Sequence, residues 1–196
     1  AAAFSRWLKV QGPISGTGNL TFDDATGAMT SVNDGFVITN DVTLAGTLTI
    51  GTGTPVRIGG VPGEDISLNA DSFGSLGTTT VVNNGTLTFS RTDAHTIGSA
   101  ISGTGSVRIG MPSAAGFGDT STQVVTIADA TKTHTGDTIV ENGTLLVNGS
   151  LPGSLVTVNA EGTLGGNGTV SQSTLLYGNL APGASVGTLS FEDELL

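Results

Sequence analysis

A three-residue phrase, Gly-Thr-Leu, recurs along the chain and constrains its fold more than any other feature. Its glycines stand at positions 46, 85, 143, 162 and 187. The first three steps between them are 39, 58 and 19 residues, close to two, three and one multiples of a unit of about 19 to 20 residues. The last step, from position 162 to position 187, is longer than one such unit. A period of this length is typical of proteins that stack one coil of chain on the next.

Each residue of the phrase suits one position in such a coil. Glycine tolerates the positive φ or the close backbone approach of a corner, and threonine suits the exposed face of a strand. Leucine, on the opposite face of the strand, points inward. Because one coil cannot bury its own leucine while a stack buries a whole column of them, the pattern predicts an all-β fold built as a solenoid.

The coils extend through most of the chain. Strand-like alternation is clear at residues 36–39, 47–50, 86–89 and 124–127, and no helix is expected between residues 11 and 191. At about 20 residues each, this stretch supplies roughly nine coils, which at a strand spacing of about 4.8 Å make a rod about 45 Å long.

A second set of phrases lies between residues 101 and 191. They are Ser-Gly-Thr-Gly (102–105), Thr-His-Thr-Gly-Asp-Thr (133–138), Val-Glu-Asn-Gly-Thr-Leu-Leu-Val-Asn-Gly-Ser-Leu (140–151), Gly-Gly-Asn-Gly-Thr-Val (165–170) and Leu-Ala-Pro-Gly-Ala-Ser-Val-Gly-Thr-Leu (180–189). Together they resemble the passenger-associated strand repeats of bacterial autotransporters and related large surface proteins. The resemblance covers a little under half of the chain and implies a right-handed parallel β-helix exported to the bacterial cell surface. Such proteins share a fold more than an activity. Where they often continue into a membrane barrel or a sorting tail, this sequence has Glu-Asp-Glu-Leu-Leu (192–196).

Composition supports a repetitive, exported β protein. The chain of 196 residues contains 31 glycines and only 5% aromatic residues, which argues against an ordinary globular core, while its 37% hydrophobic residues argue against disorder. Cysteine is absent, so neither disulfides nor thiolate metal sites contribute. The small residues Ala1-Ala2-Ala3 resemble the surroundings of a signal-peptidase site, although an engineered start would look the same. We therefore expect a secreted, extracellular or cell-surface location.

Charge argues against a nucleic-acid partner, and hydropathy argues against a membrane-spanning helix. The net charge is −10 and only six lysines and arginines are present, which argues against binding nucleic acid through its phosphates. No apolar run approaches the roughly 20 residues that a transmembrane helix requires.

The chain divides into three parts. Residues 1–10 form an N-terminal cap or docking segment, in which a short helix would carry Phe4, Trp7 and Leu8 on one face. Residues 11–191 form the parallel β-helix, and residues 192–196 form an acidic tail. Two irregular loops, 51–65 and 110–119, adjoin matching Val-Arg-Ile-Gly sequences at 56–59 and 107–110, which suggests an internal duplication.

The two ends of the rod are the predicted contact surfaces. Each end of a β-helix is a row of unpaired backbone groups that invites another chain. The predicted contact residues are Phe4, Arg6, Trp7 and Lys9 at one end and Phe191, Glu192, Glu194 and Leu195 at the other. Opposite charges at opposite ends favour a head-to-tail contact between copies, which generates filaments when it does not close.

Candidate chemical groups are sparse, and we expect no catalytic, cofactor-binding or metal site. The carboxylates Asp23, Asp24, Glu64, Asp65, Asp119, Asp129 and Asp137 fit solvated turns better than a paired acid and base, and calcium-binding nonapeptide repeats are absent. His95 and His134 are expected to be exposed strand or turn residues. The Asn-Gly pairs at Asn84, Asn142, Asn148 and Asn167 also read as glycosylation acceptors, but fit corners with left-handed backbone better. Threonine pairs such as Thr47 and Thr49 fit strand propensity better than ice binding.

The sequence thus predicts an extracellular structural protein, a non-enzymatic subunit that binds itself head to tail in a surface or matrix filament. The first alternative is a monomeric adhesin or passenger whose side binds a cell-surface or matrix glycan or a host ligand. The second is a polysaccharide lyase or hydrolase. An aromatic or polar patch along the side would favour the adhesin, whereas specialised residues at the ends would favour the filament.

Overall fold

The structure, a computed structural model, describes residues 6–27, 29, 34–60, 74–111, 123–129, 131–183 and 187–196, and leaves the side chains of Arg6 and Trp7 outside the description. Over these residues the chain forms strands joined by turns and connections, and no helix. The strands are β1 (Arg6–Val10), β2 (Ile14–Gly16), β3 (Leu20–Phe22), β4 (Asp34–Ile38), β5 (Val42–Leu44), β6 (Thr47–Ile50), β7 (Pro55–Ile58), β8 (Thr80–Asn83), β9 (Thr86–Phe89), β10 (Ala94–Thr96), β11 (Ile101–Ser102), β12 (Ser106–Ile109), β13 (Val124–Ile127), β14 (Thr138–Val147), β15 (Ser150–Leu151), β16 (Val156–Gly166), β17 (Thr169–Val170), β18 (Thr174–Leu176), β19 (Asn179–Pro182) and β20 (Ser190–Phe191).

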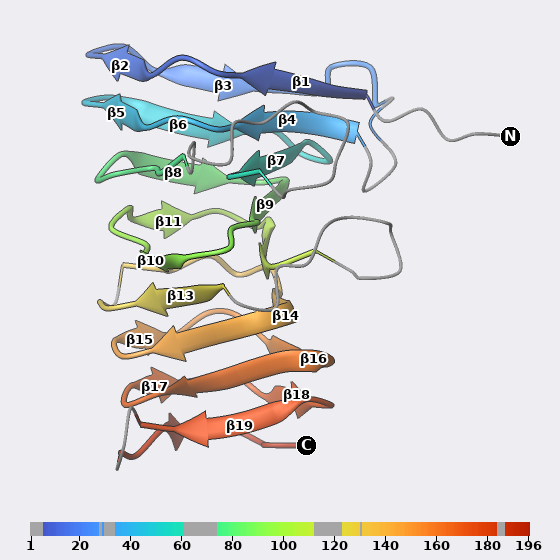
Figure 1. Cartoon of the computed structure of the whole chain (residues 1–196), viewed down its shortest axis with the longest axis vertical. Coiled ribbons are helices and arrows are strands. Elements are labelled where there is room, and N and C mark those ends of the chain that lie inside the picture. The colour runs from blue at the N-terminus through green and yellow to red at the C-terminus, as the bar shows by residue number, and fades with distance from the viewer. Residues whose placement is uncertain are drawn as a thin grey trace, which may run out of the picture.

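All pairings recorded between these strands are parallel. The strands lie across the long axis in successive layers, and the described chain begins in the layer at one end of the stack and finishes at the other (Figure 1). Parallel neighbours require the chain to cross over before it returns to the same sheet. The other strands of each layer make that crossing.

One column of inward-facing positions runs the full length of the stack, and we call it column A. Its members pair in the order Leu8, Phe36, Val56, Leu87, Val107, Thr138, Val156, Thr174, Leu195. Eight register steps therefore lead from one end to the other. The steps differ in length along the chain: the one from Thr138 to Val156 is among the shortest, and the one from Val56 to Leu87 is among the longest.

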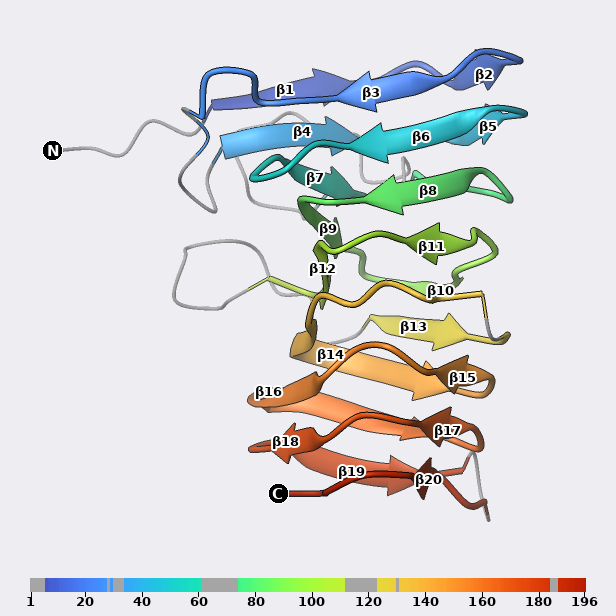
Figure 2. The same cartoon turned by 180° about the vertical axis from the view of Figure 1, so that it is seen from behind.

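The remaining strands form further sheets beside column A. One four-stranded sheet has the order β11-β8-β6-β3 and a three-stranded sheet has the order β15-β17-β20. The strands β3, β6 and β8 lie behind β1, β4 and β7 in Figure 1 and face the viewer in Figure 2. The long strands β14 and β16 belong to column A at their beginnings, and at their ends pair with β13 and β19 respectively. The expected all-β, parallel organisation is therefore confirmed.

The interior is one apolar cluster, to which the successive layers contribute side chains. Its fully buried members include Leu48, Leu87, Val107, Leu145 and Leu164. The alternation of buried and less buried residues within β6, β12 and β14 follows the period of two that the sequence shows. Because each inward side chain packs on the layers before and after it, the core is continuous along the axis.

The leucines of the Gly-Thr-Leu phrase point inward as expected, but the phrase does not occur at one equivalent position in each layer. All five leucines are buried. Only two copies of the phrase stack directly, since Gly143, Thr144 and Leu145 pair with Gly162, Thr163 and Leu164. Two other copies begin strands in different sheets, Thr47 in β6 and Thr86 in β9, and the copy at residues 187–189 precedes β20. The regular spacing of the earlier copies therefore does not count layers.

Glycine at the corners is required by the approach of the preceding layer. A Cβ on Gly105 would meet the backbone carbonyl oxygen of Gly85, and a Cβ on Gly136 would meet that of Gly105. In contrast, every described residue with a positive φ is glycine, including Gly143 at 74°. The left-handed backbone expected at the Asn-Gly pairs is therefore present at Gly143, whereas none of the described asparagines adopts it. Asparagine side chains instead bridge layers, as where Asn148 Oδ1 accepts from the backbone N–H of Asn167 at 3.2 Å.

Two expectations about irregular segments are corrected. The predicted helix within residues 1–10 is wrong for residues 6–10, which form β1 and pair with β4; residues 1–5 lie outside the described residues. The predicted loop 51–65 contains β7, while residues 61–65 lie outside the description. The matching Val-Arg-Ile sequences occupy equivalent positions, because Val56 and Val107 both pair with Leu87.

Candidate interaction surfaces

The first and last layers have an unpaired edge. In the described chain, β1, β2 and β3 each pair with a strand on one side only, namely β4, β5 and β6. At the other end, β19 pairs only with β16 and β20 only with β17. Unpaired edges of this kind are ready templates for another strand.

Column A ends in an exposed leucine at each edge. The side chain of Leu8 is 60% exposed and that of Leu195 is 43% exposed, whereas Val56, Leu87 and Val107 between them are buried. Both leucines occupy inward positions of the same column. Among the described residues, Leu8 pairs only with Phe36 and Leu195 only with Thr174, so each has a neighbouring layer on one side.

Other core residues are also left half-covered at the two ends. They pack against the buried cluster on one side only, and they are Val10, Ile14 and Leu20 in the first layer and Leu176, Leu180 and Phe191 in the last layers. The backbone near Leu195 is held in place: the Thr174 N–H donates to the Glu194 carbonyl at 2.7 Å and the Leu196 N–H donates to the Thr174 carbonyl at 2.8 Å. Both ends therefore present ordered apolar surface.

The predicted contact residues at the C-terminal end lie together at that edge. Phe191 is half-buried in β20, and Glu192, Glu194 and Leu195 are exposed. The acidic residues 192–194 connect β20 to the last position of column A. They give this end a concentrated negative charge.

The predicted contact residues at the N-terminal end lie in or before β1. Phe4 lies outside the described residues. Arg6, Trp7 and Lys9 belong to β1, and Lys9 is half-buried. The two predicted groups therefore occupy opposite end layers (Figures 1 and 2). Leu8 was not predicted as a contact residue, although its side chain is 60% exposed; its inward position in column A depends on the pairing of β1 with β4.

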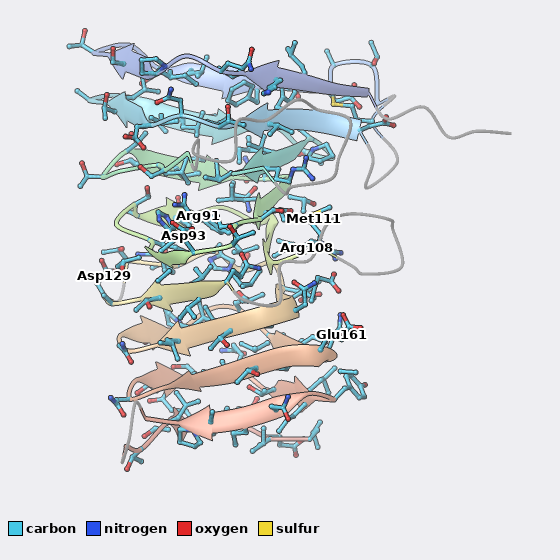
Figure 3. All side chains as sticks on the ribbon, viewed as in Figure 1. Arg91, Asp93, Arg108, Met111, Asp129 and Glu161 are labelled. Carbon is cyan, nitrogen blue, oxygen red and sulfur yellow. The ribbon has the colours of Figure 1, made fainter. Side chains whose placement is uncertain are left out.

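A polar corner on the side of the stack was also not predicted. Glu141 accepts hydrogen bonds from Arg108 and from Asn159 Nδ2, the latter at 2.6 Å. Glu161 follows a register irregularity between β14 and β16 and is exposed. Tyr177 lies at the same corner one layer on, where its N–H donates to the Val158 carbonyl, and its side chain is 69% exposed. Figure 3 shows Arg108 and Glu161 on the same side of the stack.

A second charged cluster, formed by Arg91 and Asp93, makes structural contacts within the stack. The buried guanidinium of Arg91 contacts both carboxylate oxygens of Asp93, at 2.8 and 2.9 Å, and the Gly74 carbonyl; Figure 3 shows the ion pair. This hydrogen bond lowers the pKa of Asp93. His95 packs on Phe89 with ring centroids 5.9 Å apart, and its pKa is lowered to about 4 by burial and by the charge of Arg91.

His134 is not the exposed residue that was expected, because its imidazole is buried. Its Nε2 lies 2.9 Å from Thr138 Oγ1, which lies 2.7 Å from Ser154 Oγ, and Ser154 donates to the Gly136 carbonyl at 2.8 Å. The carbonyl can only accept, so it fixes the direction of the chain: Ser154 accepts from Thr138, and Thr138 accepts from Nε2–H of His134. Burial, followed by the charge of Lys132, lowers the pKa of His134 to about 4.

The carboxylates mostly serve turns and pairs. Asp24 accepts hydrogen bonds from the Thr26 hydroxyl at 2.9 Å and from the Met29 N–H at 2.7 Å. Asp129 accepts from buried Lys132 Nζ at 2.7 Å, which lowers the pKa of Asp129 to about 2. Glu64, Asp65 and Asp119 lie outside the described residues.

The described residues contain no group of three or more histidine, aspartate or glutamate side chains that could hold a metal ion. Within the same residues, no helix has the length and apolar character needed to cross a bilayer.

No protein-family model matches the chain, and neither a curated protein nor a solved structure matches it.

Proposed function

We propose that this protein is a right-handed parallel β-helix that serves as a structural subunit and associates end to end with copies of itself. The fold proposal is supported by the parallel pairing of the strands, by the return of column A in every layer and by the strong preference of parallel crossovers for the right hand. Column A has nine positions, which are joined by eight register steps.

The observation that carries the association is the exposure of Leu8 and Leu195 at the two ends of one column that is partly buried at Phe36 and buried from Val56 to Thr174. Their exposed fractions, 60% and 43%, together amount to about one leucine side chain, whose burial stabilises a contact by about 1.5–3 kcal/mol. Pairing of the two strand edges adds backbone hydrogen bonds. Association costs about 4–15 kcal/mol in lost freedom, so several end residues must contribute and assembly depends on concentration.

We further propose that the filament belongs to a bacterial cell surface or matrix. The proposal rests on the resemblance of residues 101–191 to autotransporter strand repeats, on the absence of cysteine and on the net charge of −10. The role proposed is mechanical rather than enzymatic.

The test is electron microscopy of the purified protein together with light scattering over a dilution series. Fibres that dissociate on dilution are expected, whereas isolated short rods at every concentration would refute the assembly. Reversing one end charge, Glu194→Lys, should weaken assembly most at low salt, because exposed charges are screened as ionic strength rises. Asp137→Lys, an equal charge change at an exposed position away from both ends, serves as the matched control and should leave assembly intact.

A second function, glycan binding on the side, is favoured by the exposed Tyr177 beside Glu161 and Asn159. Aromatic side chains offer a large apolar face with a polar tip, and the neighbouring amide and carboxylate supply hydrogen-bonding groups. Screening the protein against immobilised surface polysaccharides, with Tyr177→Ala as the comparison, tests it. Binding that is lost in the variant would support this function, and no binding to any polysaccharide would refute it.

A further inference from the structure

We propose that the copies join in one register, with Leu195 of one copy opposite Leu8 of the next, so that column A continues through the joint. This inference rests on the proposed end-to-end association and specifies its geometry. Within a copy, Thr174 is already the partner of Leu195 and Phe36 the partner of Leu8. The joint would add one more step of the same kind.

The inward direction of the two leucines restricts the register. In a strand, successive side chains point to opposite faces, so a shift of one residue would turn one leucine away from the core of its neighbour. A shift of two residues in one direction would place Leu8 opposite Asp193, an acidic residue. Only the register that pairs the two leucines buries both apolar side chains.

Charge is compatible with the same register. Arg6 stands two residues before Leu8 and Asp193 two residues before Leu195. Within its own copy Arg6 pairs in register with Asp34, and Asp193, which lies in a bend, accepts a hydrogen bond from Ser173 Oγ at 2.8 Å. Aligning the leucines therefore brings a basic and an acidic position to the same part of the joint.

A corner glycine in the first layer gives a steric argument. At this corner the Cβ direction points toward the preceding layer: a Cβ on Gly46 would meet the Gly18 carbonyl, and one on Gly168 would meet the Gly149 carbonyl. Gly18 belongs to the first layer, and a Cβ there would meet nothing within 4 Å. Neither a positive φ nor crowding in the isolated copy requires glycine at position 18. A preceding copy stacked on this layer would crowd a Cβ at position 18 in the way that Gly18 crowds a Cβ on Gly46.

Disulfide cross-linking tests the register directly, because the chain contains no cysteine of its own. Lys9 and Leu196 each follow one of the two leucines, so the proposed register places them opposite each other. Partner strands are about 4.8 Å apart, within the Cα separation of about 4.4–6.8 Å that a disulfide accepts. The double variant Lys9→Cys with Leu196→Cys should give a ladder of covalent multimers on mild oxidation. The control, Lys9→Cys with Glu192→Cys, moves one thiol four residues along the terminal edge and should give at least tenfold less product.

The outcomes separate the register from the association itself. Polymers that form by light scattering while the 9/196 pair gives no ladder, or no more than the control, would overturn the register and leave end-to-end assembly standing. Absence of polymers in the wild-type protein would overturn both. A second measurement needs no variant: eight steps within a copy and one across the joint give an axial repeat of about 43 Å at about 4.8 Å per layer. A different repeat in electron micrographs would also overturn the register.

Discussion

Acidification should destabilise the folded chain through His134. The residue is buried and its pKa is about 4, against about 6.5 in an unfolded chain. The directed chain of hydrogen bonds leaves Nδ1 as the site of a second proton, and Nδ1 is buried without a hydrogen-bond partner. Protonation would therefore create a buried charge with an unsatisfied N–H close to the cationic Lys132.

Proton linkage gives the sign and the size of the change in the free energy of unfolding with pH. Between pH 6.5 and about 4 the unfolded chain holds the proton and the folded chain does not, so the free energy of unfolding falls as the pH falls. A difference of about 2.5 pKa units, at 1.36 kcal/mol per unit, is worth at most about 3 kcal/mol. From pH 7 to pH 5 the loss is about 2 kcal/mol, and below pH 4 it levels off.

The assay is urea unfolding followed by circular dichroism at pH 7, 6 and 5, in protein too dilute to assemble. His134→Gln retains an amide that can donate to Thr138 but does not titrate. We expect this variant to lose about 2 kcal/mol less than the wild type between pH 7 and pH 5. His95 also has a lowered pKa, so some pH dependence should persist in the variant. Identical pH dependence in the two proteins would refute the assignment of the proton to His134.

Three further predictions concern stability. Leu145→Ala, in the fully buried core, should lower the free energy of unfolding by about 2–5 kcal/mol, measured by urea unfolding. Gly105→Ala, where the added methyl meets the backbone of the layer before it, should cost about 1–3 kcal/mol or prevent folding, whereas Gly18→Ala should leave the melting temperature of the dilute monomer unchanged; equal effects would contradict the corner argument. Asp129→Ala, which leaves the ammonium of buried Lys132 without its carboxylate, should lower the melting temperature more than Lys132→Met does, and the reverse order would show that the ion pair is not what holds this corner.

The sequence predicts a structural feature correctly when that feature depends only on neighbouring residues in one strand. The inward Leu48 of β6 and Leu145 of β14, and the less buried threonines beside them, Thr47, Thr49 and Thr144, follow from a period of two, which is a property of one strand. The acidic 192–194 segment and the predicted N-terminal contact residues could also be located at opposite ends, because a stack that repeats in order keeps its ends apart. Leu8 was placed on the apolar face of a predicted helix but not among the contact residues, because its place in column A depends on the pairing of β1 with β4.

The number of layers and the register between them could not be predicted from the sequence of single strands. Each layer contains several strands and corners of similar chemistry. The same phrase therefore begins β6 and β9, which lie in different sheets, and also stands in the second half of β14, away from the column A position of that strand. The step from Thr138 to Val156 is much shorter than the step from Val56 to Leu87, because the amount of chain that leaves the stack between strands differs from layer to layer. Only pairing between distant residues fixes that length.

By itself, the sequence determined the strand-rich composition, the inward and outward faces of most strands and the absence of a cysteine-based framework, because each of these depends on residue type and near neighbours. The tertiary structure decided which strands stack, the burial of His134, and the place of Leu8 and Leu195 at the two ends of one column. The physical reason is that burial belongs to the layers above and below a residue, and these are supplied by chain that lies a whole coil away in the sequence.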